Sequence, residues 1–313
     1  MTGACAQSPA QHHDGGGFQL DAAPLLSRST VDRTELLREV PSAELWASGK
    51  VLLVDGKGRT QVTPDGGLVF EEAAAFGEQP IPHAVLLGSQ QGTTYWALRT
   101  ERDGAQEGWK DLRIAGALLD DTDAGLLTTA VGLLNWHDHS RYCAVCGAAT
   151  NRVKAGWARR CSGCDREEYP RTDPAVICLV HDGADQVLLA RQPSWPPQRF
   201  SVIAGFVEVG ESLEACVQRE VAEEVGVHAD RVRYLASQPW PFPRSLMLGF
   251  SAVADPAQPL RPADGEIEEA RWVSRSDVQA AMNTEDGIIP GLRLPPSVSI
   301  AHRMLRGWAF WTD

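Results

Sequence analysis

Short apolar runs, separated by turn residues, fill the first half of the chain. Between Leu45 and Leu119 these runs predict the strands of a small sheet. They are Val51–Val54, Ala84–Leu87, Thr94–Leu98 and Ile114–Leu119. Apolar residues then recur at helical spacing, which predicts a helix from about Asp123 to His139. The pattern indicates an α+β N-terminal domain over residues 25–139.

The second half of the chain mixes strand and helix patterns. Val176–Val180 and Val187–Ala190 flank a turn at His181–Asp185 and predict a hairpin. An acid-rich segment follows, and further apolar runs predict strands near 232–236, 247–253 and 269–273. Residues 297–311 return to helical spacing. We therefore expect an α/β domain over residues 171–313.

Composition limits the class of protein. The 313 residues are 43% hydrophobic and 22% charged, which is typical of a globular chain. Residues 1–24 contain few large apolar side chains, and we expect them to be poorly ordered. The net charge of -12 repels nucleic acid as a whole, so any RNA contact has to be local. We find no membrane-length apolar run and no targeting signal, and we expect a cytoplasmic protein.

Four of the seven cysteines form two Cys-x-x-Cys pairs, Cys143/Cys146 and Cys161/Cys164, with 14 residues between the pairs. This spacing lets four thiolates converge on one tetrahedral zinc ion, and it leaves no ligand position open for water or substrate. We therefore expect one structural zinc ion in a ribbon over residues 140–170. A redox dithiol or unrelated buried cysteines are the alternatives. We expect the neighbouring His137 and His139 to be helix-end residues.

Basic residues gather around the two cysteine pairs, although the chain as a whole is acidic. They are Arg152, Lys154, Arg159, Arg160, Arg166 and Arg171. A solvated ribbon surface and a surface that contacts phosphate or RNA explain this basic patch equally well. The sequence leaves the choice open.

The acid-rich segment over residues 205–227 predicts a helix with an unusual face. Ser212 suits an N-cap and Gly226 a left-handed C-cap, so the helix is expected at Leu213–Val225. At about 100° per residue, the stripe that carries Val217 also carries Glu220 and Glu224. Divalent Mg²⁺ or Mn²⁺ relieves the repulsion in such a stripe, because both are hard ions that take carboxylate oxygens. A solvated acidic helix end is the alternative.

The spacing of this segment resembles a complete Nudix box. Its fixed positions are Gly205, Glu211, Arg219, Glu220, Glu223, Glu224 and Gly226, with aliphatic Val221 and Val227. The resemblance implies a Nudix α/β/α sandwich that binds divalent metal and cleaves a nucleoside diphosphate linked to another group. It implies that Glu220 and Glu224 are the main metal ligands. Glu223 is implied as a further ligand or as the base for water, and Arg219 as the residue that orients the glutamates.

A proline-rich segment lies shortly after the box, with the sequence Ser-Gln-Pro-Trp-Pro-Phe-Pro-Arg-Ser over residues 237–245. Its prolines stiffen the chain, so Trp240 and Phe242 lose little entropy when they bind a ligand. Rigid aromatic rings suit stacking on flat bases. A core loop with buried aromatic rings is the alternative. Placed after a four-cysteine ribbon and an N-terminal domain, the segment resembles the signature of the NADH pyrophosphatase family of Nudix hydrolases.

This second resemblance implies a substrate and further site residues. The implied reaction is hydrolysis of NADH and NAD⁺ to nicotinamide mononucleotide and AMP, with removal of NAD caps from RNA 5′ ends. A homodimer is implied, in which some pocket residues come from the partner subunit. Glu266 is implied as the last metal ligand, although Glu268 and Glu269 crowd the same segment. The implied substrate contacts are Phe206, Trp240, Tyr169, Gln238, Phe242 and Ser245.

Two other functions compete with this one. A broader Nudix hydrolase would prefer ADP-ribose or another ADP-linked compound, and the intact Trp240 motif argues against it. A zinc-ribbon protein that binds nucleic acid or a regulatory partner without hydrolysis would be expected to lack a box glutamate, and none is missing here. The sequence does not decide between free NAD(H) and capped RNA, or between Mg²⁺ and Mn²⁺.

Overall fold

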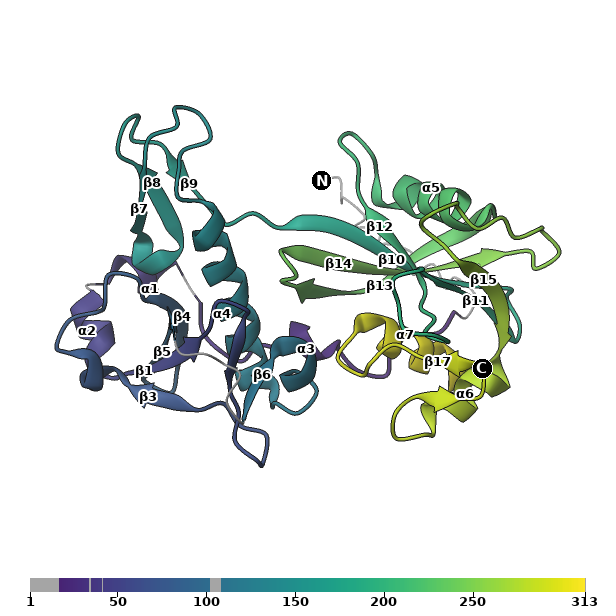
Figure 1. Ribbon diagram of the computed structural model, residues 1–313, viewed down its shortest axis with the longest axis horizontal. Coiled ribbons are helices and arrows are strands. Elements are labelled where there is room, and N and C mark those ends of the chain that lie inside the picture. Colours follow the sequence, from purple (N-terminus) through teal and green to yellow (C-terminus); the bar gives the residue numbers. More distant parts are fainter. Residues whose placement is uncertain (1–16, 34, 41, 102–107, 313) are drawn as a thin grey trace, which may run out of the picture.

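The computed structural model describes residues 17–33, 35–40, 42–101 and 108–312. Figure 1 shows an N-terminal half that ends in the ribbon and a C-terminal half built around a larger sheet. The long helix α4 (Asp121–His139) belongs to the N-terminal half, and the chain passes from it into the ribbon strands.

The N-terminal sheet has the strand order β3-β1-β5-β4. Its strands are β1 (Gly49–Val54), β3 (Phe70–Glu72), β4 (Val85–Gln90) and β5 (Thr93–Arg99), and β2 (Arg59–Gln61) pairs separately with β6 (Trp109–Asp111). Strands β1 and β5 run parallel, whereas β4 and β5 are antiparallel. Short helices complete this half: η1 (Leu25–Ser27), α1 (Leu36–Glu39), α2 (Ser42–Ala47), η2 (Ala73–Phe76) and α3 (Leu112–Ala115).

The strand predicted at residues 114–119 is wrong, because the helical turn α3 covers the start of this segment. The Asp111 carboxylate accepts hydrogen bonds from the backbone N–H groups of Arg113 and Ile114. An N-cap of this kind stabilises a helix start. The capping aspartate therefore outweighs the apolar run that suggested a strand.

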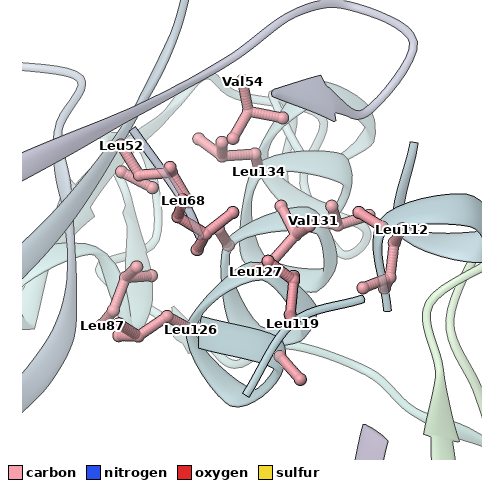
Figure 2. Close-up of a cluster of buried hydrophobic side chains, with 14 of the residues drawn as sticks. Leu52, Val54, Leu68, Leu87, Leu112, Leu119, Leu126, Leu127, Val131 and Leu134 are labelled. Atoms are coloured by element: carbon pink, nitrogen blue, oxygen red, sulfur yellow. The ribbon is translucent and has the colours of Figure 1, made fainter. Parts of the chain in front are cut away.

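Helix α4 supplies the core of the N-terminal half. Its side chains Leu127, Val131 and Leu134 are buried against the sheet residues Leu52 and Val54. Figure 2 shows these side chains pointing toward one another. The predicted helix at 123–139 is confirmed, with its start two residues earlier at Asp121, where Asp120 caps it.

The ribbon is an antiparallel sheet of β7 (Thr150–Val153), β8 (Ala158–Cys161) and β9 (Glu167–Glu168), with the turn η3 (Lys154–Gly156). Arg159 of β8 is buried, although we expected it in the basic patch. Its guanidinium donates hydrogen bonds to Thr150 Oγ1 and to His137 Nδ1 at the end of α4. Arg159 therefore fastens the ribbon to α4 and is not part of the surface.

The C-terminal half is built on a sheet with the order β13-β14-β10-β11-β15, and β12 pairs with β10. The strands are β10 (Asp173–His181), β11 (Gln186–Arg191), β12 (Ile203–Phe206), β13 (Ala229–Trp240), β14 (Ser245–Ala254) and β15 (Glu269–Ser274). The helices are α5 (Leu213–Val225), α6 (Arg275–Met282) and α7 (Ile300–Ala309), and β16 (Ile288–Ile289) pairs with β17 (Leu292–Arg293). The predicted hairpin is confirmed by the antiparallel pairing of β10 and β11.

Alternation along β10 creates three layers. Val176 and Cys178 are buried with the apolar side chains of α5, whereas Ile177 and Leu179 are buried with those of α6 and α7. Figure 1 shows α5 on one face of the sheet and α6 and α7 on the other. The predicted Nudix α/β/α sandwich, preceded by a zinc ribbon and an α+β domain, is confirmed.

The N-terminal segment of residues 1–24 is only partly described. Residues 1–16, including Cys5, lie outside the described residues. Residues 17–24 depart from the expected disorder, because the Phe18 ring is buried in the core beside α7. Arg233 of β13 donates hydrogen bonds to the carbonyls of Gly17 and Phe18. The buried Phe18 ring therefore orders residues 17–24, although their average composition predicts disorder.

Candidate active site

Helix α5 presents the acidic residues of the Nudix box. It starts after Ser212, whose hydroxyl accepts a hydrogen bond from the Ala215 N–H, and it ends at Gly226 with a φ of 74°. These limits are the predicted ones. Val217 and Val221 are fully buried against the sheet, so helical spacing brings Glu220 and Glu224 to the same side.

Strand β12 lies against the acidic end of α5. A Cβ placed on Gly205 would stand 1.9 Å from the carboxyl carbon of Glu220. Only glycine lets the β12 backbone approach this carboxylate so closely. The first glycine of the box therefore makes room for one of its glutamates.

Arg219 joins four parts of the box. Its guanidinium binds Glu211 through two hydrogen bonds of 2.7 and 2.9 Å. The Nη1 atom donates to Glu220 at 2.9 Å and to Glu223 at 3.0 Å, and Nη2 donates to the Phe206 carbonyl at 3.0 Å. Arg219 thus fixes the positions of carboxylates from both the loop and the helix, which fits its predicted orienting role.

The pairing of Arg219 with Glu211 shifts the pKa of each residue so that its ionised form is favoured. Hydrogen bonds from Arg219 and from the Glu208 N–H lower the pKa of Glu211 to about 2. Hydrogen bonds to Glu211 and the other two carboxylates raise the pKa of Arg219 above its ordinary value, which is already high. The pair stays ionised at neutral pH and acts as a rigid brace under the glutamates.

The pKa of Glu224 is raised, in contrast to that of Glu211. Its side chain is 9% exposed, and burial together with the nearby charges of Glu220 and Glu266 raises its pKa to about 8. Burial also raises the pKa of Glu220. A loop holds Glu266 near this point, because the Ala263 N–H donates to the Glu224 carbonyl and the Glu266 N–H to the Ala263 carbonyl.

The three acidic residues between positions 266 and 269 make different contacts. Glu268 forms an ion pair with Arg191, and Glu269 lies in β15 with its carboxylate 3.7 Å from Arg271. Only Glu266 contributes its charge to the neighbourhood of Glu224. Of the three, Glu266 is the one placed to join the box glutamates.

These carboxylates fit a divalent cation by their chemistry. Glu220, Glu224 and Glu266 repel one another, and two of them are withdrawn from water, so a bound cation would offset both costs. In the described part of the chain, the cysteine quartet is the only group of three or more potential ligands with all its ligand atoms within 4.8 Å. The glutamates therefore stand farther apart than the thiols.

A cavity of about 190 Å³ opens beside Glu224 and is lined by Gln238 and Trp240 of the proline-rich segment. Gln238 is fully buried, and its Nε2 donates to the Val298 carbonyl at 3.1 Å. Its Oε1 has no partner among the described residues. A buried acceptor without a partner costs free energy, and a ligand that donates a hydrogen bond here would recover it.

Two cavity residues were missed by the sequence analysis. Trp195 and Arg199 line the same cavity as Glu224, and the Arg199 guanidinium lies 5.3 Å from the centre of the Trp195 ring. The signal was present in the sequence Trp-Pro-Pro over residues 195–197, since prolines also stiffen the chain around this aromatic residue. No spacing rule linked that loop to the Nudix box.

Four of the predicted substrate contacts lie elsewhere. Phe206 is 59% exposed at the end of β12, and Phe242 packs against the N-terminal core beneath the Arg113 guanidinium. Ser245 lines a second cavity between α4 and the proline-rich segment, and Tyr169 lines a groove on the ribbon. Within one chain, Gln238 and Trp240 line the Glu224 cavity, Phe206 lies beside the box glutamates through its carbonyl contact with Arg219, and the other three lie apart.

The four cysteines converge as predicted. The Sγ atoms of Cys143 and Cys164 lie 3.8 Å apart, and those of Cys146 and Cys161 lie 3.3 Å apart. Backbone N–H groups of Cys164 and Gly163 lower the pKa of Cys161 to about 6, which favours the thiolate. His137 and His139 lie in the last turn of α4, as expected. The donor set fits one tetrahedral zinc ion.

Known domain families match three successive parts of the chain. A model of the NADH pyrophosphatase-like rudimentary NUDIX domain matches residues 43–136. The NADH pyrophosphatase zinc ribbon domain matches residues 138–169, and the NUDIX domain matches residues 171–290. Fold, box and ribbon together define an enzyme of the Nudix hydrolase class.

Similar proteins identify the family of this chain within the Nudix hydrolase class. The chain is 46% identical to the NAD-capped RNA hydrolase NudC of Mycobacterium bovis, over 94% of this chain and 97% of that protein. It is 36% identical to the mitochondrial NAD(P)H pyrophosphatase NUDT13 of Mus musculus, over 84% and 80% of the two chains. It is 38% identical to the NAD-capped RNA hydrolase NUDT12 of Homo sapiens, over 61% and 42%. The chain belongs to the NADH pyrophosphatase family of Nudix hydrolases.

Within the described residues, no helix is both long enough and apolar enough to cross a bilayer.

Proposed function

We propose that this protein hydrolyses the pyrophosphate bond of NADH and NAD⁺, releasing nicotinamide mononucleotide (reduced or oxidised) and AMP. The single observation that carries the proposal is the cavity beside Glu224, because it joins a box glutamate to Trp240 and Gln238 of the family signature. The same reaction on the 5′ end of an RNA would remove an NAD cap and leave a monophosphate.

The residues of the box have different proposed roles in the reaction. In our proposal Glu223 accepts the proton of the water that attacks phosphorus, since its carboxylate is 60% exposed and within reach of solvent. Arg219 holds Glu223 and Glu220 in place from behind. Water adds its oxygen to one phosphorus, and the bridging oxygen leaves with the other.

Glu220, Glu224 and Glu266 would hold the catalytic cation, with Glu223 as a further ligand. Bound Mg²⁺ or Mn²⁺ would neutralise charge on the pyrophosphate and acidify water. We propose either ion, because oxygen ligands suit both. The Gly205 backbone keeps the Glu220 carboxylate close to β12, so that the glutamates reach the substrate from one side.

Substrate recognition would rest on the stiff aromatic cavity. Trp240 offers a flat ring, and Gln238 Oε1 offers an unused acceptor for an amide or amino N–H of a base. Trp195 and Arg199 add a second aromatic and a cation at the same cavity. Phe206 lies exposed at the end of β12 and is proposed to stack on the nicotinamide ring.

We further propose a cytoplasmic homodimer. Tyr169, Phe242 and Ser245 belong to the predicted substrate site, yet none of them lines the cavity beside Glu224 in its own chain. A partner subunit would bring such residues to a neighbouring active site. The support for the dimer is thus an incomplete set of substrate contacts within one chain.

Product analysis by mass spectrometry tests the proposed reaction. The purified protein is offered NADH, NAD⁺, ADP-ribose and an NAD-capped RNA, each with Mg²⁺, with Mn²⁺ and with a chelator. We expect metal-dependent release of reduced nicotinamide mononucleotide and AMP from NADH, faster than cleavage of ADP-ribose. Faster cleavage of ADP-ribose would indicate the broader hydrolase. No cleavage of any compound would favour the non-catalytic binding protein.

A further inference from the structure

A groove of about 600 Å³ lies on the ribbon, outside the active site described above. Its walls come from the end of α4, the first cysteine pair, the end of the ribbon and the loop before β14. The side chains that matter here are Trp136, Tyr142, Arg166, Tyr169, Arg171 and Arg244. Three of the six are cations and three are aromatic rings.

The cations of the groove are available to a ligand. Arg166 and Arg171 are exposed, and neither side chain makes an ion pair or hydrogen bond with the described residues. Arg244 shares its charge with Asp173 at 2.7 Å. Two exposed guanidinium groups without partners form a local site for phosphate, although the whole chain is acidic.

The acids that line the groove are already engaged. Glu167 accepts a hydrogen bond from Arg160 at 2.6 Å and lies 3.4 Å from the Lys154 ammonium. Glu168 accepts a hydrogen bond from the backbone N–H of Ala144 at 3.2 Å. Among the described residues, Arg160 and Lys154 therefore offset the charge of Glu167, whereas Glu168 keeps its charge beside the exposed cations Arg166 and Arg171.

Two tyrosine rings stand in the groove on a rigid frame. Tyr142 is 70% exposed, but its backbone is bridged to Ala149 and it directly precedes the zinc ligand Cys143. Tyr169 is 52% exposed, and its hydroxyl donates to Glu167 at 2.7 Å. Tyr142 therefore offers an exposed ring on a backbone that the ribbon holds, which lowers the entropy cost of stacking on a flat partner.

The groove is connected to the catalytic cavity through shared residues. Trp240 lines both the cavity beside Glu224 and the second cavity next to α4. Arg171 and Arg244 line both that second cavity and the groove on the ribbon. The shared side chains place the ribbon groove next to the second cavity, and the second cavity next to the Glu224 cavity.

We propose that this groove binds the first unpaired nucleotides of an RNA whose NAD cap occupies the active site. Phosphates would contact Arg166 and Arg171, and a base would stack on Tyr142, the combination typical of single-strand binding. The proposal rests on the proposed decapping function. It assigns Arg166 and Arg171 of the basic patch to RNA contact.

The test compares capped RNA with free NADH as substrates of the full-length, zinc-loaded protein. The RNA is unpaired and about ten nucleotides long, within the range that single-strand sites cover. The variants are Tyr142→Ala, Arg166→Ala and the double variant. Lys57→Ala and Tyr234→Ala are matched controls, because both residues are exposed and neither lines the groove.

For capped RNA we expect the double variant to raise KM at least about fivefold, the lower end of what one stacked base contributes. Its kcat and KM for NADH and its zinc content should match wild type. Arg166→Ala should lower the slope of log KM against log salt by about one, the loss of one phosphate contact. Both control variants should behave as wild type.

Three outcomes would overturn this proposal. An unchanged KM for capped RNA in the double variant would mean that the groove does not bind the RNA body. Equal losses on NADH and capped RNA would mean that Tyr142 and Arg166 support the fold. If wild type cleaved NADH but not capped RNA, the decapping function and this groove would both be rejected, and NADH hydrolysis would stand.

Discussion

Helix α4 packs on the N-terminal sheet and helix α5 on the C-terminal sheet, but the two helices carry different faces. Each packs one side against a sheet, and α4 fills that side with apolar and small residues such as Leu127 and Val131. Helix α5 buries Val217 and Val221, and it places Glu220 and Glu224 about one and two turns after Val217 on the same side. The N-terminal half resembles a rudimentary Nudix domain, and its helix α4 contains no glutamate and no arginine.

Helices α4 and α5 differ in which of their residues serve the fold and which serve the proposed chemistry. Apolar residues supply most of the buried side of α4, whereas α5 holds Glu220 and Glu224, and burial raises the pKa of both. Such an arrangement disfavours the folded protein unless a cation is bound. The active helix is thus the one whose local sequence conflicts with simple packing.

The largest expected effect comes from the base. Glu223→Gln keeps the size of the side chain but removes the acceptor for the proton of water. We expect kcat for NADH to fall about 10²- to 10⁴-fold, with unchanged zinc content and thermal stability, since this side chain is largely exposed. Steady-state kinetics checks this. Activity close to wild type would show that another group accepts the proton.

The next prediction concerns the space beneath Glu220. Gly205→Ala places a methyl group on the carboxylate, so Glu220 has to move. A displacement of about 1 Å at a reacting centre costs up to about 100-fold in rate. We expect a loss of this order in kcat with little change in KM. A matched substitution on α4, Gly132→Ala, whose nearest new contact is 3.7 Å away, should leave kcat unchanged.

A smaller effect is expected from the aromatic cavity. Trp240→Ala removes a ring that we propose stacks on the substrate, and stacking contributes about 1 to 3 kcal/mol per base. The preference for NADH over ADP-ribose, measured as the ratio of kcat/KM values, should fall about tenfold. Equal losses on both substrates would indicate that Trp240 only supports the fold.

The smallest effect should come from Phe242, which connects the two halves. Its ring packs on the N-terminal core beneath Arg113, so Phe242→Leu should lower the free energy of unfolding by about 1 kcal/mol. Urea unfolding measures this change. The KM for NADH should also rise, because the proposed homodimer brings this ring to a neighbouring active site. A KM equal to that of wild type would show that Phe242 is structural only.

Local signals allowed much of the fold and site to be predicted. The cap at Ser212 and the glycine at 226 set the limits of α5, and the cysteine spacing located the zinc site. Contacts between residues far apart in the sequence could not be predicted in this way. Neither the burial of Phe18 nor the contact of Arg159 with His137 leaves a periodic trace, because each depends on a partner far away in the sequence.

The substrate contacts show the same limit. Gln238 and Trp240 were predicted from a motif and do line the cavity, whereas Trp195 and Arg199 reach it from a loop with no recognisable spacing. The structure also separates Tyr169 and Phe242 from that cavity. Sequence motifs identify residue types, and only the fold determines which of them meet.

Metal binding to α5 tests the central claim most directly. Calorimetric titration of Mn²⁺ into the zinc-loaded protein is compared with the same titration of Glu220→Gln/Glu224→Gln, which keeps both side-chain shapes. We expect Mn²⁺ to bind wild type, and the double variant to lose both that binding and NADH hydrolysis while retaining its zinc and its fold. A double variant that still binds Mn²⁺ with wild-type affinity and cleaves NADH would contradict the assignment of catalysis to the carboxylates of this helix.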